Sequence, residues 1–274
     1  MVRHQFLVLG IGGSNPPAPA NLSNLLDLKR SSSWVSFCIS LSANVPFEAL
    51  CGGWVNEISQ GKKIMENFLY LGSKSQARKQ LLEDAKIQFV LVDSFADESK
   101  CEWGLTLQES VEKIALYKME HVVLPKGKKE GETCFVLTAD SLTQNPDGSI
   151  SGKPVDRTDA IAKIKASRGL ATGGSAFCLD KRVYRSGNWE IFKRIEKYAE
   201  AKYIWDVPDE WIDVYIEKSF GTVSAGAIAV EGYGAQFLKT VQGSHSAIIG
   251  LPMFQLREAL QSLGFFDSIL KKDF

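Results

Sequence analysis

Two short motifs bring chemically useful side chains close together along the chain. The apolar run Cys134–Leu137 leads into Thr138-Ala139-Asp140-Ser141, and Gly152-Lys153-Pro154 follows a few residues further on. A buried strand that delivers one carboxylate to the edge of a cleft, with a lysine nearby, suits a phosphate-cleaving site. Asp140 can hold a divalent cation or deprotonate a water molecule, and Lys153 can neutralise phosphate charge.

The same residues also fit a plain β-hairpin with no chemical role. Residues 145–148 read Asn-Pro-Asp-Gly, which is a strong turn signal, and a second short strand follows them. On this segment alone the two interpretations are equally well supported, so residues elsewhere in the chain must decide between them.

Two other segments place basic side chains where a phosphate group can bind. Ser73 precedes a predicted helix that carries Arg78 near its start. Helix N-termini present unpaired N–H groups, so Ser73 can contact a phosphate group and Arg78 can grip it with two hydrogen bonds. The alternative is an ordinary capped helix with solvated basic residues. Lys118 lies in an apolar helical stripe beside Ile114 and Ala115, where it either lines a cleft or extends its amino group to solvent.

The C-terminal part holds two segments rich in small residues. Ala225–Gly234 carries a single carboxylate, Glu231, and fits either the wall of a substrate cleft or a tight turn between strands. Gln242–Pro252 is a Gly/Ser-containing loop that leads into a helix. Its lone His245 is interpreted as structural, because no Ser/His/Asp or Cys/His set accompanies it.

The composition excludes several classes of function. The 274 residues include 32 basic and 32 acidic side chains, interspersed and without a basic block, so we expect no nucleic-acid partner. The five cysteines are scattered without zinc-ligand spacing, which predicts reduced thiols, no structural zinc and a cytoplasmic location. No apolar run is long enough to span a membrane, so we expect no membrane association.

The chain divides near Met65 into two unequal parts. Residues 1–64 hold a proline-rich stretch, three consecutive serines and apolar patches without periodicity. We expect a poorly ordered extension there, with Met65 as an alternative natural start. The glycine-rich Leu7–Ser14 is followed by prolines rather than a helical pattern, which argues against a nucleotide-binding glycine loop. Residues 65–274 are predicted to form one folded domain.

Apolar runs and helical patterns alternate along this domain, which predicts an α/β fold. The Asp or Thr at residues 156 and 158 is expected to cap the third helix. We predict strands at residues 68–71, 87–92, 134–138, 174–183, 197–206 and 237–241. We predict helices at residues 76–86, 105–123, 158–167, 208–218 and 253–263, with a loop at 243–250.

Taken together, these segments resemble the Maf family of nucleotide pyrophosphatases over about residues 66–270, in the family's own order. Leu71–Leu82 is similar to the segment L-x-S-x-S-P-R-R-x-E-L-L that opens the family's domain, and Ile114–Met119 is similar to its L-A-x-x-K-A helix. No single motif is decisive, but their order is specific. The other matching segments are Ala139–Ser141, Gly152–Asp156, Ala225–Gly232 and Gly243–Pro252.

The resemblance implies a fold, a reaction and a set of site residues. The implied fold is Maf/ITPase-like, an elongated mixed sheet flanked by helices, with two lobes and a central cleft. The implied reaction hydrolyses a nucleoside triphosphate to its monophosphate and pyrophosphate with Mg²⁺ or Mn²⁺. Members of the family often form dimers, so the resemblance implies that this protein can form a homodimer. By position, Asp140 would activate water and, with Glu98, hold the metal ion. The implied phosphate contacts are Ser73, Arg78, Lys118 and Lys153.

Three positions bear on specificity. Ala77 stands where the family carries its first arginine. The resemblance therefore implies that this protein lacks a phosphate or base contact at that position. Ser141 conservatively replaces the more frequent threonine. Glu231 stands where one subfamily, similar to enzymes acting on dTTP and UTP, carries Gln, and another, similar to enzymes acting on 7-methyl-GTP, carries Glu. A carboxylate accepts two hydrogen bonds from guanine N–H groups, whereas Gln pairs with a pyrimidine edge.

From these residues we expect Glu231 to bind the substrate. We also expect the protein to hydrolyse a non-standard or modified nucleotide, and this reaction would remove such nucleotides from the cellular pool. The alternative is a catalytically weakened, nucleotide-binding regulator of cell division, which Ala77 favours. Retention of Asp140, Lys118 and Lys153 argues against this alternative, because a protein that only binds nucleotides needs no water-activating carboxylate.

Overall fold

A long central strand, β3, organises the fold. The computed structural model describes residues 67, 69–97, 101 and 104–270. They include a seven-stranded mixed sheet in the order β2-β1-β3-β5-β6-β7, with β4 paired to β3. β1 runs parallel to β2 and β3, and the other paired strands are antiparallel. The strands are β1 (Leu69–Leu71), β2 (Phe89–Leu91), β3 (Thr133–Gln144), β4 (Ile150–Ser151), β5 (Gly169–Arg185), β6 (Asn188–Trp205) and β7 (Leu238–Gly243).

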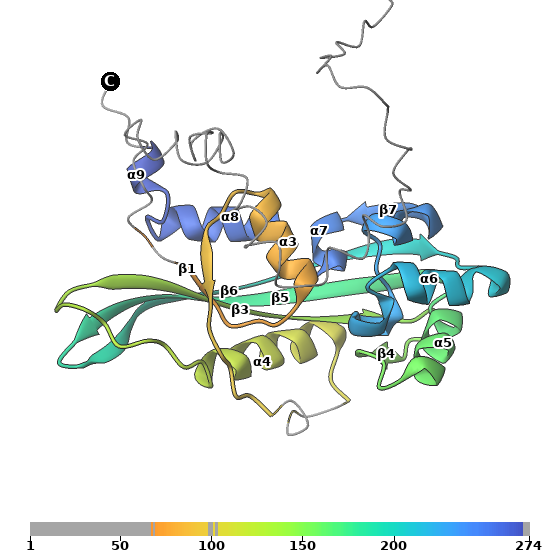
Figure 1. The fold of residues 1–274 in the computed structure, drawn as a ribbon, viewed down its shortest axis with the longest axis horizontal. Coiled ribbons are helices and arrows are strands. Elements are labelled where there is room, and N and C mark those ends of the chain that lie inside the picture. The colour runs from red at the N-terminus through yellow and green to blue at the C-terminus, as the bar shows by residue number, and fades with distance from the viewer. Residues whose placement is uncertain (1–66, 68, 98–100, 102–103, 271–274) are drawn as a thin grey trace, which may run out of the picture. The chain divides into compact units, whose positions relative to one another are not determined.

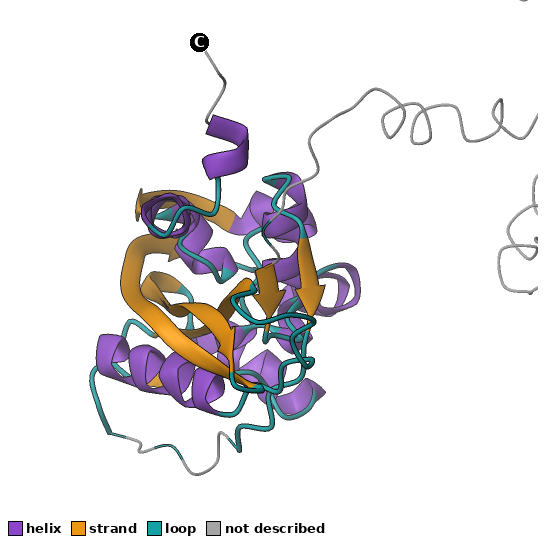
Figure 2. Ribbon diagram, turned by 90° about the vertical axis from the view of Figure 1, so that its left-hand side faces the viewer, coloured by secondary structure: helices purple, strands orange, loops and turns teal. Residues whose placement is uncertain are grey.

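Helices cover both faces of this sheet (Figure 1). α4 lies along one face, whereas α3 and α8 lie along the other, and Figure 2 shows the twisted sheet between them. The α-helices are α3 (Gln76–Asp84), α4 (Leu107–Glu120), α5 (Arg157–Ala166), α6 (Ile212–Lys218), α7 (His245–Ile249), α8 (Met253–Ser262) and α9 (Asp267–Leu270). Short 3₁₀ helices are η5 (Asp209–Trp211), η6 (Gly221–Val223), η7 (Ala225–Ala227) and η8 (Gly232–Phe237). The predicted mixed sheet flanked by helices is confirmed.

The alternation of side chains along β3 assigns its residues to the two faces, because successive residues of a strand point to opposite sides. Phe135, Leu137 and Ala139 pack in the cluster that β3 shares with α3 and α8. Val136 packs on the side of α4, in a cluster with Met119. With both faces covered, this part of the strand reads as a continuous apolar run, as expected for a buried strand.

The observed elements differ from the predicted ones at several boundaries. The strands predicted at 174–183 and 197–206 extend over β5 (Gly169–Arg185) and β6 (Asn188–Trp205). β3 does not end near Asp140 but continues to Gln144, where it pairs with β4. The Asn-Pro-Asp-Gly turn at residues 145–148 does connect β3 to β4, so the hairpin and the candidate site occur together. The predicted loop at 243–250 contains the short helix α7, because Ser244 caps its first turn and Gly250 ends it at a φ of 136°.

Capping explains where the helices of the site begin. Thr106 and Glu109 form a reciprocal capping box that starts α4. Asp156, rather than Thr158, caps α5 by accepting a hydrogen bond from the Asp159 N–H. The helices in the described ranges include none that is long and apolar enough to cross a membrane.

Two expectations concern residues that the structure does not describe, and both remain predictions. Residues 1–66 lie outside the described residues, so the structure does not bear on the proposed N-terminal extension or on the boundary near Met65. The metal-binding candidate Glu98 also lies outside them.

The β5–β6 hairpin contains a buried carboxylate with two basic partners. The Asp180 side chain is fully buried, and it accepts hydrogen bonds from Arg182 Nη2 at 2.8 Å and from Arg194 Nε at 2.7 Å. A buried carboxylate of this kind requires both partners, since burying an unpaired charge is costly. The three side chains therefore link β5 to β6 through buried hydrogen bonds.

We expect Asp180→Ala to lower the free energy of unfolding by about 3 kcal/mol, because it leaves two arginines without their acceptor. Urea denaturation followed by circular dichroism measures this change. Glu190→Ala on the same hairpin is the matched control, since the Arg185–Glu190 pair is exposed, with its charged atoms 3.6 Å apart, and such pairs contribute less than about 1 kcal/mol. Equal losses in the two variants would contradict the role given to Asp180.

Candidate active site

The candidate site lies where β3 has no strand partner along one edge. β1 pairs with β3 only as far as Leu71 and Leu137, and β4 pairs with it from Thr143 onward. In the described part of the chain, the intervening residues Thr138–Leu142 are therefore paired with β5 but not with a strand on the other side. Side chains from both faces of the sheet can approach one another at this gap, which contains Asp140.

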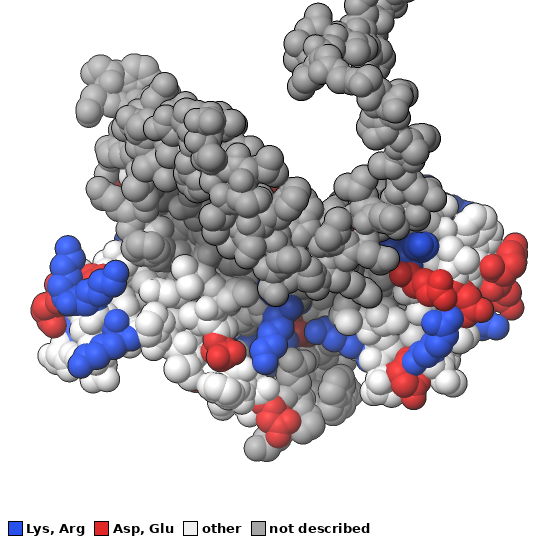
Figure 3. Space-filling view, in the orientation of Figure 1, with Lys and Arg blue, Asp and Glu red and all other residues white. Residues whose placement is uncertain are grey.

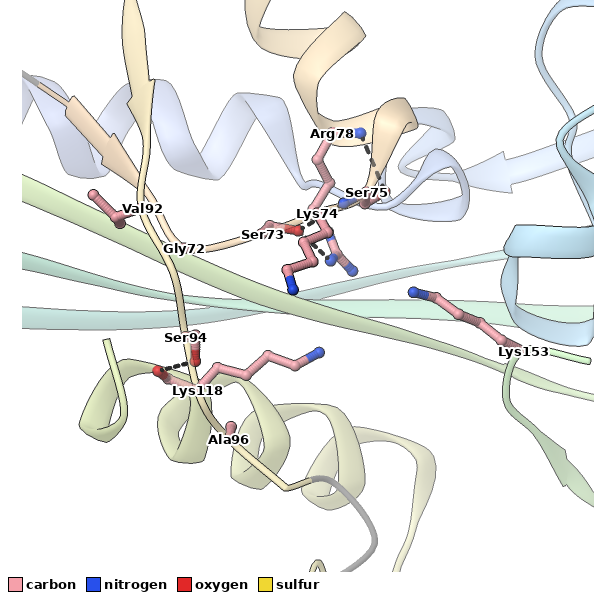
Figure 4. Close-up of a pocket in the computed structure, with 10 residues that line it drawn as sticks. All are labelled: Gly72, Ser73, Lys74, Ser75, Arg78, Val92, Ser94, Ala96, Lys118 and Lys153. Atoms are coloured by element: carbon pink, nitrogen blue, oxygen red, sulfur yellow. Dashed lines mark hydrogen bonds between the residues drawn. The ribbon is translucent and has the colours of Figure 1, made fainter. Parts of the chain in front are cut away.

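A cavity of about 250 Å³ opens at this gap. Five segments form it: the loop between β1 and α3, the first turn of α3, the segment after β2, helix α4, and the loop after β4 (Figure 4). Basic side chains dominate its lining. The described lining residues are Gly72, Ser73, Lys74, Ser75, Arg78, Val92, Ser94, Ala96, Lys118 and Lys153.

An ion pair joins α4 to β3 beside this cavity. Lys118 Nζ donates to Asp140 Oδ1 at 2.6 Å, and the two side chains are only 13% and 9% exposed. The carbonyl oxygen of Lys118 accepts a hydrogen bond from Ser94 Oγ at 2.9 Å, which ties the segment after β2 to the same helix. Lys118 thus lines the cleft instead of extending to solvent. The catalytic role of Asp140 stays a prediction.

Arg78 holds several parts of the site together. Its side chain is buried, and its Nε donates to the carbonyl oxygen of Gly250 at 2.7 Å. Its Nη1 donates to Ser73 Oγ at 3.1 Å, and its Nη2 donates to Ser141 Oγ at 2.7 Å. Ser175 on β5 extends this network by donating to Ser141 Oγ at 2.7 Å. The geometry gives Arg78 a positioning role, whereas the predicted phosphate contact is not tested.

Lys153 reaches the cavity from the loop that follows β4. This loop is held by two backbone contacts: the Gly226 N–H donates to the Gly152 carbonyl at 3.0 Å, and Lys163 Nζ donates to the Lys153 carbonyl at 2.9 Å. The first contact brings the small-residue segment around Gly226 against the lysine loop. Two sequence motifs separated by about 70 residues thus form one wall of the site.

Two further cavities adjoin the first, and Ser75 and Lys153 line all three. The smaller one, about 40 Å³, contains Asp140 and Ser141 together with Ile228 and other apolar side chains. The larger one, about 470 Å³, is bordered by aliphatic, aromatic, hydroxyl and amide groups and by two lysines. Its described lining residues are Lys74, Ser75, Gln76, Ala77, Lys153, Pro154, Phe220, Thr222, Val223 and Ser224. A basic cavity therefore borders more apolar ones.

Glu231 is placed differently from the other candidates. It precedes η8 and lines none of the three cavities. Both of its carboxylate oxygens are buried without a hydrogen-bond partner in the described ranges, and this burial raises the pKa of Glu231 above its ordinary value. Its predicted contact with the nucleobase is not tested by this placement.

We expect Glu231→Gln to stabilise the protein more at pH 8 than at pH 5. A raised pKa means that the folded protein disfavours the ionised carboxylate, so the wild type loses stability as pH rises above the ordinary value for Glu. Gln does not ionise, so the Glu231→Gln variant does not lose this stability as pH rises. Urea denaturation at both pH values measures the difference in the free energy of unfolding between variant and wild type. Glu217→Gln on the exposed side of α6 is the control. A gain that is the same at both pH values would refute this account.

A divalent cation at this site remains a prediction, and Asp140 is the one carboxylate among the described lining residues that could hold it. Among the described residues no group of three or more His, Cys, Asp or Glu side chains could hold a metal ion by itself. Mg²⁺ is commonly held through one or two carboxylates plus substrate phosphates and water. Asp140 supplies one such carboxylate. When bound, the cation would polarise phosphoryl oxygens and offset their charge.

The predicted site residues did not include Lys74 or Ser94, which both line the cavity. Lys74 lies between the two serines of the Ser73–Ser75 segment, where solvated basic residues beside an ordinary capped helix explain the sequence equally well. Ser94 contacts α4 through its hydroxyl group, and no local pattern in the sequence marks it. Both contribute to the cavity through long-range packing, which spacing along the chain does not reveal.

Comparison with known proteins identifies the family. The sequence model described as Maf-like protein matches residues 68–263. The chain belongs to this family, and the resemblance inferred from its motifs is confirmed.

Curated relatives carry related names. The chain is 28% identical over 212 residues to the dTTP/UTP pyrophosphatase of Fusobacterium nucleatum subsp. nucleatum. This alignment covers 74% of this chain and 100% of that protein. It is 32% identical over 202 residues to the nucleoside triphosphate pyrophosphatase of Synechococcus sp. (strain JA-3-3Ab), covering 72% and 94%. A protein of that name from Nostoc punctiforme is 31% identical over 199 residues, covering 71% and 93%.

Proposed function

We propose that the protein hydrolyses a nucleoside triphosphate to the monophosphate and pyrophosphate. The observation that carries this proposal is the Lys118–Asp140 pair, which presents a carboxylate beside a cavity lined by further basic side chains. The curated names of the relatives support the same reaction class. The phosphate chain would occupy the basic cavity, and the nucleoside would extend toward the more apolar ones.

The proposed reaction uses these groups in distinct ways. An oxygen of water forms a bond to the α-phosphorus, and the bond from that phosphorus to the oxygen shared with the β-phosphate breaks. Asp140 accepts a proton from the attacking water, while Lys118 holds the carboxylate in place. Lys153 offsets the negative charge that develops on the departing pyrophosphate.

We further propose that the preferred substrate is a modified or otherwise non-standard nucleotide. This proposal rests on Glu231, in the position where the family distinguishes pyrimidine from methylated purine substrates. Burial shifts Glu231 toward its protonated form, which both donates and accepts hydrogen bonds as Gln does. A pyrimidine substrate is therefore the competing outcome, and the relative from Fusobacterium nucleatum is named for one.

A substrate panel tests the reaction and the base preference together. The full-length protein is incubated with Mg²⁺ or Mn²⁺ and dTTP, UTP, CTP, GTP or 7-methyl-GTP, and pyrophosphate release is measured. We expect release to be fastest with 7-methyl-GTP. Release from dTTP and UTP alone would keep the reaction but refute the argument from Glu231. Nucleotide binding without any release would favour the alternative of a nucleotide-binding regulator.

Replacing Asp140 tests the mechanism. We expect Asp140→Asn to reduce kcat by about 10²–10⁴-fold, which is the usual contribution of a general base, while nucleotide binding persists. Steady-state kinetics and equilibrium binding measure the two quantities. Asp147→Asn in the exposed turn of the same hairpin is the control and should leave kcat within about twofold. Turnover that survives in Asp140→Asn would refute the role given to this carboxylate.

A further inference from the structure

Lys74 extends into the candidate site from the loop between β1 and α3. Its side chain lines both the cavity of about 250 Å³ and the adjoining one of about 470 Å³. Figure 4 shows its amino group pointing into the space that Lys118 and Lys153 also face. In Figure 3, basic side chains gather near the middle of the same face of the molecule. Lys74 thus lies at the junction between the basic cavity and the more apolar one.

The basic residues of the site differ in their protein contacts. Lys118 pairs with Asp140, and the guanidinium group of Arg78 bonds to three protein oxygens. Lys74 has no hydrogen-bond or ion-pair partner within the described part of the chain. Its ammonium group therefore keeps its donors available, and a bound anion would offset the repulsion between it and the neighbouring cations.

The charges around the cavities indicate which anion would do so. Asp140 is the one carboxylate among the described residues that line the three cavities, and Lys118 already pairs with it. A multiply charged, flexible anion can contact several separated ammonium groups at once. A phosphate chain has this chemistry, whereas a single carboxylate ligand does not span the groups.

We propose that Lys74 binds the phosphate chain of the substrate and is a further substrate-binding residue of this protein. This inference rests on the proposed function, because it assigns Lys74 to the same substrate. It adds a cation supplied by the loop before α3, next to Ala77. Ala77 lines the same 470 Å³ cavity, so an arginine introduced at that position would bring a positive charge to the same space.

The test compares Lys74→Met with Lys79→Met in the full-length protein. Lys79 lies in α3, directly after the loop that carries Lys74, but it lines none of the three cavities. We expect Lys74→Met to lower kcat/KM for the best nucleotide of the panel about tenfold to a hundredfold, mainly through KM, which corresponds to the loss of one charge-assisted hydrogen bond. Lys79→Met should stay within about twofold of the wild type.

A binding measurement separates this inference from the proposed reaction. Isothermal titration calorimetry with inorganic tripolyphosphate should show weaker binding by Lys74→Met than by the wild type or Lys79→Met. Lys74→Arg, or Ala77→Arg combined with Lys74→Met, should recover most of the lost affinity, since either restores a cation at this place. Thermal melting of each variant confirms that it is folded.

The outcomes decide as follows. A selective loss in Lys74→Met, with recovery by at least one arginine variant, supports the inference. Unchanged tripolyphosphate binding in Lys74→Met, an equal loss in Lys79→Met, or no recovery in either arginine variant overturns it. A wild type that binds tripolyphosphate through Lys74 but releases no pyrophosphate from any nucleotide would refute the proposed reaction and leave the binding inference standing.

Discussion

The ion pair between Lys118 and Asp140 is the interaction on which the site depends. Two charges that are largely removed from water cost several kcal/mol each unless they are held close together, and here they lie 2.6 Å apart. Helix α4 must therefore keep one position against β3. Thr138 Oγ1 secures that position by donating to the Ala115 carbonyl at 2.8 Å. If α4 were displaced along β3, this hydrogen bond would break and both buried charges would lose their partner.

The gap at the edge of β3 explains how both faces of one strand serve a single site. Asp140 projects toward α4, and its neighbour Ser141 projects toward the opposite side, where Arg78 binds it. In a fully paired sheet these two side chains would be separated by the adjacent strand. Because β1 leaves β3 after Leu71, both can border the same small cavity. The Gly72 N–H still bonds to the Leu137 carbonyl at 2.9 Å, which fixes the point of departure.

Local patterns predicted the fold class and the principal charged residues, but not their partners. Alternating apolar runs and helical stripes indicate an α/β sheet, and a lysine within an apolar stripe indicates that Lys118 needs a partner. Two of the three partners of Arg78 lie 63 and 172 residues away, and no spacing rule relates them to it. The strand was predicted to end at Thr138 because polar residues follow from Asp140 onward, although β5 pairs with this strand as far as Gln144. Burial of Glu231 likewise depends on tertiary packing.

Arg78 and the lysines of this site have different roles because a guanidinium group and an ammonium group differ in geometry and flexibility. A guanidinium group is a rigid, planar set of donors, so Arg78 suits the fixed geometry of three protein acceptors. An ammonium group is a point charge on a flexible stem, so lysines can adjust as charge shifts between phosphate groups. Under the proposed reaction, negative charge moves toward the departing pyrophosphate. Cations that can follow this movement, such as Lys74 and Lys153, would stabilise the bound substrate and the departing group in turn, while Arg78 keeps the loop that carries Lys74 in place.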